Sequence, residues 1–228
     1  ENCKISNSEF LGVSASSDSK FAAFSNNEIS NNGSFAVQVY GNAVHTLGSN
    51  NNIDSDLGIE VSADRIEIQS GTWINHGVPY VVTGDVYIGS ATGSEIIIEP
   101  GTTISFASGR GMYVGYYSST FGKLIAQGNT GNPITFTSAA PEGSKAAGSW
   151  DYIGFYDGTS SGSILDYCVV EFGGSSKGNI YCTSTSAGTP TISNCTIRNS
   201  GEYGINVSGG ASPTLTGNTF SNNASGDT

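Results

Sequence analysis

The stretch Ile192-Ser193-Asn194-Cys195-Thr196-Ile197 decides the fold, because its order of apolar residue, small polar segment and second apolar residue recurs along the chain. The same phrase occurs at 5–10, 24–29 and 215–220, and in a more divergent form at 165–170. Leu215 follows Ile192 by 23 positions, and Ile192 follows Leu165 by 27. A phrase that returns at such intervals indicates a repeat protein, in which each repeat stacks on the next.

A second phrase alternates strictly between apolar and variable residues, at 37–39, 59–61, 112–114, 153–155, 180–182 and 205–207. This alternation predicts short strands with one buried face. Several short strands in each period of about 20 to 27 residues are typical of a β-solenoid. We therefore expect one buried column, in a single parallel sheet, to contain Val37, Val39, Ile59, Val61, Met112, Val114, Ile180, Cys182, Ile205 and Val207.

The middle of the chain carries further strand-like segments at 96–106, 124–128 and 133–138. Taken with the phrase at 192–197, these segments resemble secreted bacterial and archaeal proteins of the right-handed parallel β-helix repeat family, closely over 66–223 and more loosely over 1–65. The resemblance implies the pectate-lyase-like superfold, which hosts lyases, glycosidases, adhesins and structural repeats. We expect residues 1–228 to form a single all-β domain, a right-handed parallel β-helix of about nine or ten rungs.

Composition restricts the functional classes. Only 12% of the residues are charged, Gly supplies 32 positions, and the formal net charge is −11. Eight scattered basic residues cannot build a phosphate-binding surface, which argues against a nucleic-acid partner. No apolar run is long enough to span a membrane. The resemblance to secreted proteins makes an extracellular or cell-surface location the expectation.

The sequence contains no convincing catalytic constellation. The two histidines, His45 and His76, have no acidic cluster beside them. Paired acids could hydrolyse a glycosidic bond, but we interpret the best group as solubilising residues between strands: Asp151, Asp157, Asp166 and Glu171. The segment 54–58 has the alternating acids of a calcium loop but lacks the later bidentate Glu. We predict no catalytic, cofactor-binding or metal-binding residue.

Two cysteines fall in the same column of successive repeats. Cys168 and Cys195 occupy equivalent places in their phrases, and stacked positions lie about 4.8 Å apart, within the Cα range of a disulfide. They are the candidate disulfide pair, although free thiols acting as small buried hydrophobes are an equal alternative.

Three tyrosines alternate with inward apolar residues and are therefore predicted to face solvent: Tyr87, Tyr113 and Tyr181. They are candidate carbohydrate contacts, because exposed aromatic rings can stack on sugars. The same column is expected to hold Gln38, Glu60, Gly154 and Asn206, which would break any continuous platform. This pattern favours a structural role, in which the rings shield the sheet. An ice-binding ladder is disfavoured because Lys4, and Asp166 or its neighbours, interrupt the column in which Thr191 and Thr214 align.

Two functional hypotheses follow. The first is a non-catalytic extracellular structural or adhesive module that assembles end to end or belongs to a longer array. Residues 192–223 resemble 5–32, and neither end carries an obvious cap, so both ends would present unpaired strand edges. The alternative is a polysaccharide-active or carbohydrate-binding β-helix, with a polysaccharide as its partner.

Overall fold

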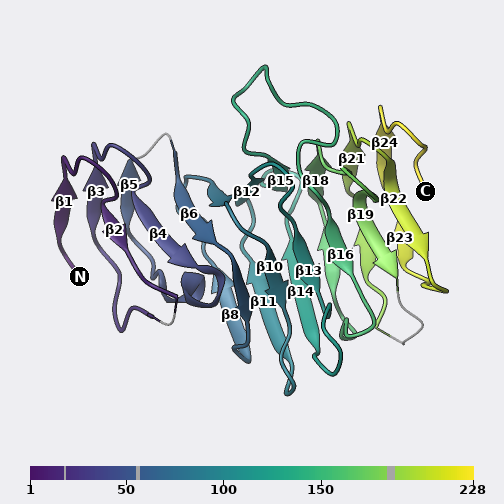
Figure 1. Cartoon of the computed structure of the whole chain (residues 1–228), viewed down its shortest axis with the longest axis horizontal. Helices are drawn as coiled ribbons and strands as arrows, with labels where there is room; N and C mark the ends of the chain where they lie inside the picture. Colours follow the sequence, from purple (N-terminus) through teal and green to yellow (C-terminus); the bar gives the residue numbers. More distant parts are fainter. Residues whose placement is uncertain (18, 55–56, 184–187) are drawn as a thin grey trace.

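The computed structural model describes residues 1–17, 19–54, 57–183 and 188–228. The chain coils into a right-handed parallel β-helix, as predicted, and successive rungs are stacked along the long axis of Figure 1. Each described strand pairing of this solenoid is parallel and joins a strand to its equivalent in the neighbouring rung. Among the described residues, no helix is long and apolar enough to cross a membrane.

Sheet I runs along the whole solenoid and contains nine strands in the described part of the chain: β2 (Val13–Ser14), β4 (Val37–Tyr40), β6 (Ile59–Ser62), β9 (Tyr80–Val82), β12 (Thr103–Phe106), β15 (Ile134–Ser138), β18 (Cys168–Glu171), β21 (Thr196–Arg198) and β24 (Thr219–Ser221). Nine strands are joined by about eight turns of the chain, slightly fewer than the nine or ten rungs expected.

Sheet II is built from β7 (Asp64–Ile66), β10 (Val86–Ile88), β13 (Met112–Val114), β16 (Ile153–Phe155), β19 (Gly178–Thr183) and β22 (Tyr203–Ser208). Sheet III is built from β8 (Ser70–Trp73), β11 (Ser94–Ile98), β14 (Gly122–Gln127), β17 (Ile164–Asp166), β20 (Thr191–Ser193) and β23 (Thr214–Thr216). At the amino-terminal end lie sheet IV, formed by β1 (Lys4–Ser6), β3 (Glu28–Ser30) and β5 (Asn52–Asp54), and the 3-10 helix η1 (Gly41–Thr46).

The phrase at 192–197 makes the corner between sheets III and I. Asn194 adopts a left-handed conformation (φ 50°), which asparagine tolerates better than most residues, and it separates β20 from β21. Ile192 and Ile197 on either side are fully buried. One rung further on, the Asn218 side chain accepts a hydrogen bond from the Cys195 amide (2.9 Å) and donates one to the Ile192 carbonyl (2.8 Å). Asparagines in this phrase therefore bend the chain and tie neighbouring rungs together.

The prediction of a single buried column was wrong in one respect, because its residues divide between two sheets. Those at 37–39 and 59–61 belong to sheet I, whereas those at 112–114, 180–182 and 205–207 belong to sheet II. The inward direction was predicted correctly, and all ten are buried except Val207. Alternation identifies the buried face of a strand but not the sheet to which it belongs, because every sheet of a solenoid shares that period.

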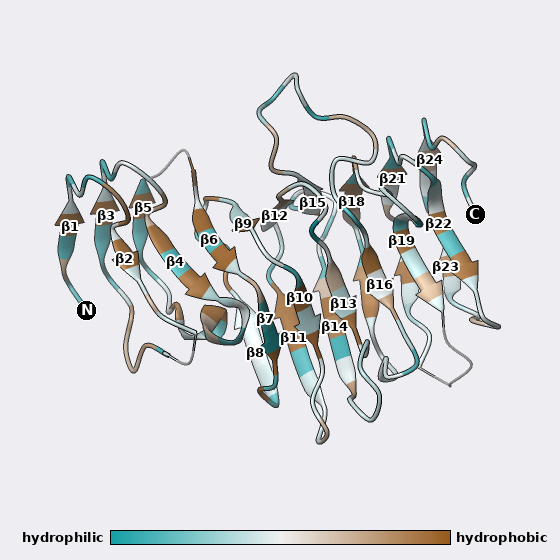
Figure 2. Ribbon diagram, viewed as in Figure 1, coloured by the Kyte–Doolittle hydropathy of each residue, from teal (hydrophilic) through white to brown (hydrophobic). Residues whose placement is uncertain are grey.

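The core is a continuous stack of aliphatic and aromatic side chains enclosed by the sheets. Figure 2 shows the brown apolar residues along the strands and paler or teal residues in most of the turns. A long connection between β15 and β16 projects from the solenoid (Figure 1) and returns at Trp150. Trp150 stacks on Phe106 at 4.4 Å and donates its indole N–H to the Glu171 carbonyl (2.8 Å). This buried anchor fixes the start of β16.

Candidate functional site

Most of the tyrosines of the chain gather on the outer face of sheet II. Seven of the eleven form one network of ring contacts, which we call the tyrosine cluster: Tyr87, Tyr113, Tyr116, Tyr117, Tyr152, Tyr156 and Tyr181. Their centroid separations, from 4.8 to 6.4 Å, lie in the range of attractive aromatic pairs. The cluster covers four successive strands, β10, β13, β16 and β19, and the loop that follows β13.

The middle column of this face is Tyr87, Tyr113, Gly154 and Tyr181, in strand register. Gly154 leaves a gap that is filled by the two residues flanking β16, Tyr152 and Tyr156. The hydroxyls of Tyr152 and Tyr156 meet at 2.9 Å, and a Cβ on Gly154 would lie only 2.6 Å from the Tyr156 ring. The glycine therefore makes room for two rings that lie against the sheet.

Tyr113 is the buried centre of the cluster, only 6% exposed. A Cβ on Gly111 would lie 2.6 Å from the Tyr113 hydroxyl, so this ring also lies over a glycine. The hydroxyl donates a hydrogen bond to Asp151 Oδ2 at 2.7 Å. Asp151 is held in turn by the hydroxyls of Ser175 and Ser176. This arrangement fixes the ring and supports the more exposed tyrosines around it.

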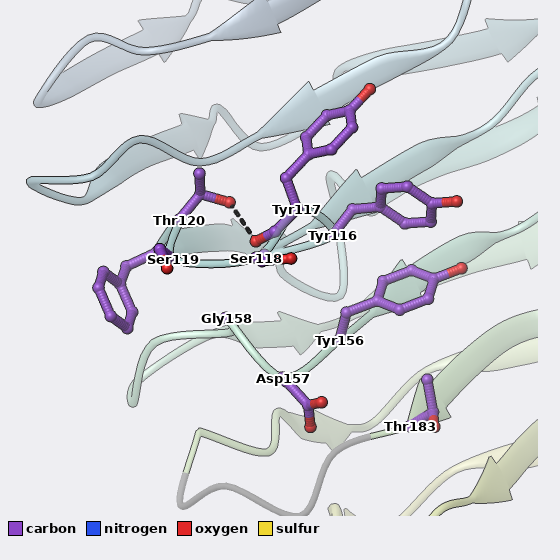
Figure 3. Close-up of a pocket in the computed structure, with 11 residues that line it drawn as sticks. Tyr116, Tyr117, Ser118, Ser119, Thr120, Tyr156, Asp157, Gly158 and Thr183 are labelled. Carbon is purple, nitrogen blue, oxygen red and sulfur yellow. Dashed lines mark hydrogen bonds between the residues drawn. The ribbon is translucent and has the colours of Figure 1, made fainter.

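Tyr116 and Tyr117 form the outermost layer, 47% and 41% exposed. They follow Gly115, whose positive φ (63°) turns the chain out of β13. The loop is closed by Thr120, whose side chain donates to the Tyr117 carbonyl at 2.7 Å (Figure 3). Two exposed phenol rings are thus presented by a hydrogen-bonded turn.

Four partly exposed rings follow one another along the solenoid, and we call them the tyrosine row: Tyr117, Tyr116, Tyr156 and Tyr181. The successive centroid separations are 5.2, 4.8 and 5.9 Å. Figure 3 shows the first three rings projecting in the same general direction. The last two steps are close to the spacing of neighbouring strands, about 4.8 Å, because Tyr116, Tyr156 and Tyr181 belong to successive rungs. Tyr117 follows Tyr116 in the same loop, and its ring contacts that of Tyr87 in the preceding rung at 5.0 Å.

A cation lies over the ring at each end of the row. The Arg65 guanidinium is 4.9 Å from the centroid of Tyr117, and the Lys177 ammonium is 5.4 Å from that of Tyr181. Arg65 also contacts Glu67, with 3.2 Å between Nε and Oε1. Contacts of this kind contribute about 0.5 to 1 kcal/mol at exposed sites and orient the terminal rings.

Four hydroxyls of the cluster, those of Tyr87, Tyr113, Tyr152 and Tyr156, are held in their protonated form. Burial raises the pKa of Tyr87 to about 12. Burial also raises the pKa of Tyr113, with the hydrogen bond to Asp151 as a further cause, and those of Tyr152 and Tyr156. Because a protonated phenol both donates and accepts hydrogen bonds, these four tyrosines offer uncharged rings and hydroxyls.

A cavity of about 310 Å³ opens beside the row. Tyr116, Tyr117 and Tyr156 form one side, and Asp157, Thr183 and the turn at 118–121 form the rest. In Figure 3 the Asp157 side chain points away from the three rings. The volume of the cavity is at the lower end of the range found for small-molecule binding sites.

The three predicted carbohydrate contacts, Tyr87, Tyr113 and Tyr181, come together in this cluster. All three point outward, but Tyr113 is covered by its neighbours rather than facing solvent. The expected interruption of the column is confirmed for Gly154 and Asn206, which lie in register with Tyr181, and was wrong for the other two residues. Gln38 and Glu60 lie in sheet I, not in the tyrosine column, and flanking rings fill the gap at Gly154. The tyrosine pairs at 116–117 and 152/156 were the missed signal, because they become neighbours of the column only in the folded rungs.

The candidate disulfide pair lies in adjacent rungs, as expected. Cys168 and Cys195 are both buried in the inner column of sheet I, and the Cys168 amide donates to Cys195 Sγ at 3.4 Å. Both are free thiols in this structure, and burial raises the pKa of Cys168. Cys182 lies in sheet II in register with Val207, as predicted. The disulfide itself stays a prediction.

The carboxylates considered for catalysis occupy separate places. Asp151 precedes β16, Asp157 follows it, Asp166 ends β17 and Glu171 ends β18, so the four are distributed over sheets II, III and I. Asp166 accepts hydrogen bonds from Ser193 and Asn194. Glu171 pairs with Arg198 at 2.7 Å. At least three of these acids therefore have structural partners.

The two histidines and the calcium-like segment add no site. His45 and His76 belong to different rungs, and burial lowers the pKa of both. Among the described residues, no three His, Cys, Asp or Glu side chains gather in a way that could hold a metal ion. The segment 54–58 contains residues 55 and 56, which lie outside the described residues.

The aligned threonines of sheet III are interrupted, as expected, but the interrupting residues are isoleucines of the same column. Thr191 and Thr214 align with Thr72, Ile97, Ile125 and Ile164. Lys4 belongs to sheet IV and Asp166 to the adjacent column, so neither interrupts it. The column nevertheless mixes threonine with isoleucine and is not a threonine ladder.

Comparison with known proteins identifies the family but no closely related protein. No curated protein and no solved structure gives a significant match to the chain. Residues 74–227, about two thirds of the chain, match the family model described as the right-handed β-helix region. This range contains every tyrosine of the cluster and agrees with the interval in which the sequence resemblance is closest. Together with the observed solenoid, the match shows that the chain belongs to the right-handed β-helix region family.

Proposed function

We propose that this protein is a non-catalytic, extracellular β-helix module that adheres to a polysaccharide through the tyrosine cluster of sheet II. The observation that carries the proposal is the concentration of seven of the eleven tyrosines on one outer face. Grouped aromatic residues at a surface, two of them more than 40% exposed, are typical of recognition surfaces.

A glycan fits this surface better than other classes of ligand. Sugars combine apolar C–H faces, which pack on aromatic rings, with hydroxyls, which hydrogen bond to phenols. The cluster offers both kinds of contact, and burial keeps four of its phenols protonated. A nucleic acid would need clustered cations, and the chain has eight Lys and Arg against nineteen Asp and Glu.

A non-catalytic role is supported by the way the acids near the cluster are engaged. Asp151 accepts three hydrogen bonds from tyrosine and serine hydroxyls, and Glu171 is bonded to Thr137 and Arg198. Glycoside hydrolysis needs two carboxyl groups facing one bond across about 5 to 10 Å. Asp151 lies next to a strand of sheet II and Glu171 ends a strand of sheet I, and both carboxylates are already engaged in hydrogen bonds.

The binding test uses affinity electrophoresis and pull-down with neutral polysaccharides (cellulose, chitin, xylan, mannan) and acidic ones (pectate, alginate). The intact chain is expected to be retarded by at least one of them. The double variant Tyr116→Ala/Tyr117→Ala should bind about 5- to 150-fold more weakly, because each lost ring removes about 0.5 to 1.5 kcal/mol. Tyr203→Ala, which removes an exposed tyrosine outside the cluster, is the matched control.

Retention of full affinity by the double variant, or binding to none of the six polymers, would reject the proposal. Incubation with the same panel and assay for new reducing ends or unsaturated products tests the absence of catalysis. Product formation would show that the module is an enzyme rather than an adhesin.

End-to-end assembly is a second candidate function, favoured by the carboxy-terminal rung. Val207 and Leu215 point inward, in register with Cys182 and Ile192, yet they are 41% and 38% exposed. A further rung, from a longer polypeptide or from a second copy, would cover them. Light scattering and electron microscopy of the 228-residue chain should show concentration-dependent rods. A strict monomer at high concentration would exclude self-assembly.

A further inference from the structure

We infer that the tyrosine row binds a linear, uncharged glycan along the solenoid axis, with one sugar for each ring over four successive sugars. This inference rests on the proposed glycan-binding function and adds the orientation, length and charge of the ligand. The row consists of Tyr117, Tyr116, Tyr156 and Tyr181, three of which belong to or follow successive strands of sheet II.

The first step compares the spacing of the rings with the length of one sugar in the ligand. Neighbouring rings of the row are 5.2, 4.8 and 5.9 Å apart. The parallel strands that set this repeat lie about 4.8 Å apart. An extended chain of equatorially linked pyranoses advances by nearly the same distance for each sugar. A ligand running along the axis therefore meets a new ring at every sugar, whereas a ligand running across the axis leaves the row after one or two.

The second step concerns the angles between the planes of neighbouring rings. Successive rings of the row are turned by 88°, 81° and 77° to one another. Each ring is therefore oriented differently from its neighbour in the row. In a β-1,4-linked glycan each sugar is flipped relative to the one before, so that neighbouring sugars also differ in the face that they present. A glycan of this kind therefore suits a row in which neighbouring rings differ in orientation.

The third step is the charge of the surface. Cations lie at the two ends of the row, where Arg65 and Lys177 cover terminal rings. Carboxylates lie beside the row, because Asp157 lines the same cavity as Tyr116 and Tyr156. Asp151 bonds to Tyr113, at the centre of the cluster. A polyanion would have to pass these carboxylates on a protein of net charge −11. The ligand expected along the row is therefore uncharged.

The test measures affinity against ligand length by isothermal titration. Size-fractionated oligosaccharides of two to six sugars are prepared from the polysaccharide retained in the binding screen, with cellulose- and chitin-derived series first. Affinity should rise by about two- to tenfold for each sugar up to four and then level off. Tyr181→Ala should move the plateau from four sugars to three and leave the affinity for trisaccharides within about twofold. Tyr203→Ala should leave the whole curve unchanged.

The outcomes separate the inference from the function on which it rests. Failure of the chain to bind any polysaccharide removes both. Polysaccharide binding with full affinity already at the disaccharide, or with a rise that continues to six sugars, keeps the proposed function but rejects the axial arrangement. A preference for pectate or alginate over every neutral polymer rejects the uncharged ligand. A plateau at four that Tyr181→Ala shortens to three supports the inference.

Discussion

Sheets I and II are parts of one solenoid with the same strand spacing, yet their outer faces are used differently. On sheet I the outward column is polar except for Val81. Several of its members bond to one another: Ser14 to Gln38, Gln38 to Glu60, and Thr137 and Arg198 to Glu171. On sheet II the outward column is aromatic, and the rings of the tyrosine row remain partly exposed. The inner faces are alike, so the core specifies the solenoid whereas the outer residues specify what each face can contact.

The largest expected effect concerns the inner columns, where sheet I carries two adjacent cysteines and sheet II carries Cys182 alone. In an oxidising compartment we expect Cys168 and Cys195 to form a disulfide that closes a loop of 27 residues and stabilises the protein by about 3 kcal/mol. Thiol counting under denaturing, non-reducing conditions should then find two free thiols, from Cys3 and Cys182. Four free thiols in exported protein would contradict the pairing.

Replacing Gly154 should break the aromatic face without disturbing the backbone, because its φ is not in the left-handed region. The side chain of Gly154→Val must displace the rings of Tyr152 and Tyr156, which we expect to cost about 1 to 3 kcal/mol of unfolding free energy. Near-ultraviolet circular dichroism should lose much of its tyrosine signal. Thr135→Val places a valine at an outward position of sheet I and should change stability by less than about 0.5 kcal/mol. Equal losses of unfolding free energy in the two variants would show that the outer faces of sheets I and II do not differ in packing.

Breaking the hydrogen bonds of the outward column of sheet I should lower the stability of the protein without weakening polysaccharide binding. Arg198→Ala leaves the buried Glu171 carboxylate with Thr137 as its described side-chain partner, and we expect a loss of about 1 to 2 kcal/mol. Polysaccharide affinity should stay within twofold of that of the intact chain. Urea unfolding and affinity electrophoresis on the same preparation provide the two readouts. A parallel loss of affinity would mean that the two faces are coupled.

A smaller loss of stability is expected at alkaline pH, and it should come from the tyrosines of sheet II. Because burial raises the pKa of Tyr87, Tyr113 and Tyr156 above the value of about 10 in the unfolded chain, the unfolded state loses these protons first. The resulting stabilisation is fully present below about pH 10 and is lost as pH rises through the folded-state values. Urea midpoints measured across this range should fall, and the fall should be smaller in Tyr87→Phe/Tyr156→Phe. An unchanged slope in that variant would assign the effect elsewhere.

The fold could be predicted from the sequence because solenoid rungs repeat their own pattern. The phrase at 192–197 carries two buried isoleucines and a left-handed asparagine, and these requirements are local. The assignment of strands to sheets could not be predicted in the same way. Ile59-Glu60-Val61 and Ile180-Tyr181-Cys182 alternate identically but lie in sheets I and II.

The tyrosine cluster could be predicted only in part. Tyr87, Tyr113 and Tyr181 were recognisable because they lie between inward apolar residues. Tyr116 and Tyr117 follow the strand in a turn that no alternation describes, and their contact with Tyr87 depends on the stacking of rungs. The role of Gly154 could not be predicted from the sequence either. A glycine in a strand indicates only a gap in the outer face, and that the rings of Tyr152 and Tyr156 fill this gap is seen only in the structure.

Chemical footprinting of the unaltered protein tests the central claim most directly. Tyrosines are nitrated with and without the polysaccharide identified in the binding screen, and each site is quantified by mass spectrometry. The account predicts that ligand protects Tyr116, Tyr117 and Tyr181, while Tyr203, an exposed tyrosine outside the cluster, is nitrated equally in both samples. Equal nitration of all four residues in a sample that has bound the polysaccharide would show that the glycan is held elsewhere on the solenoid.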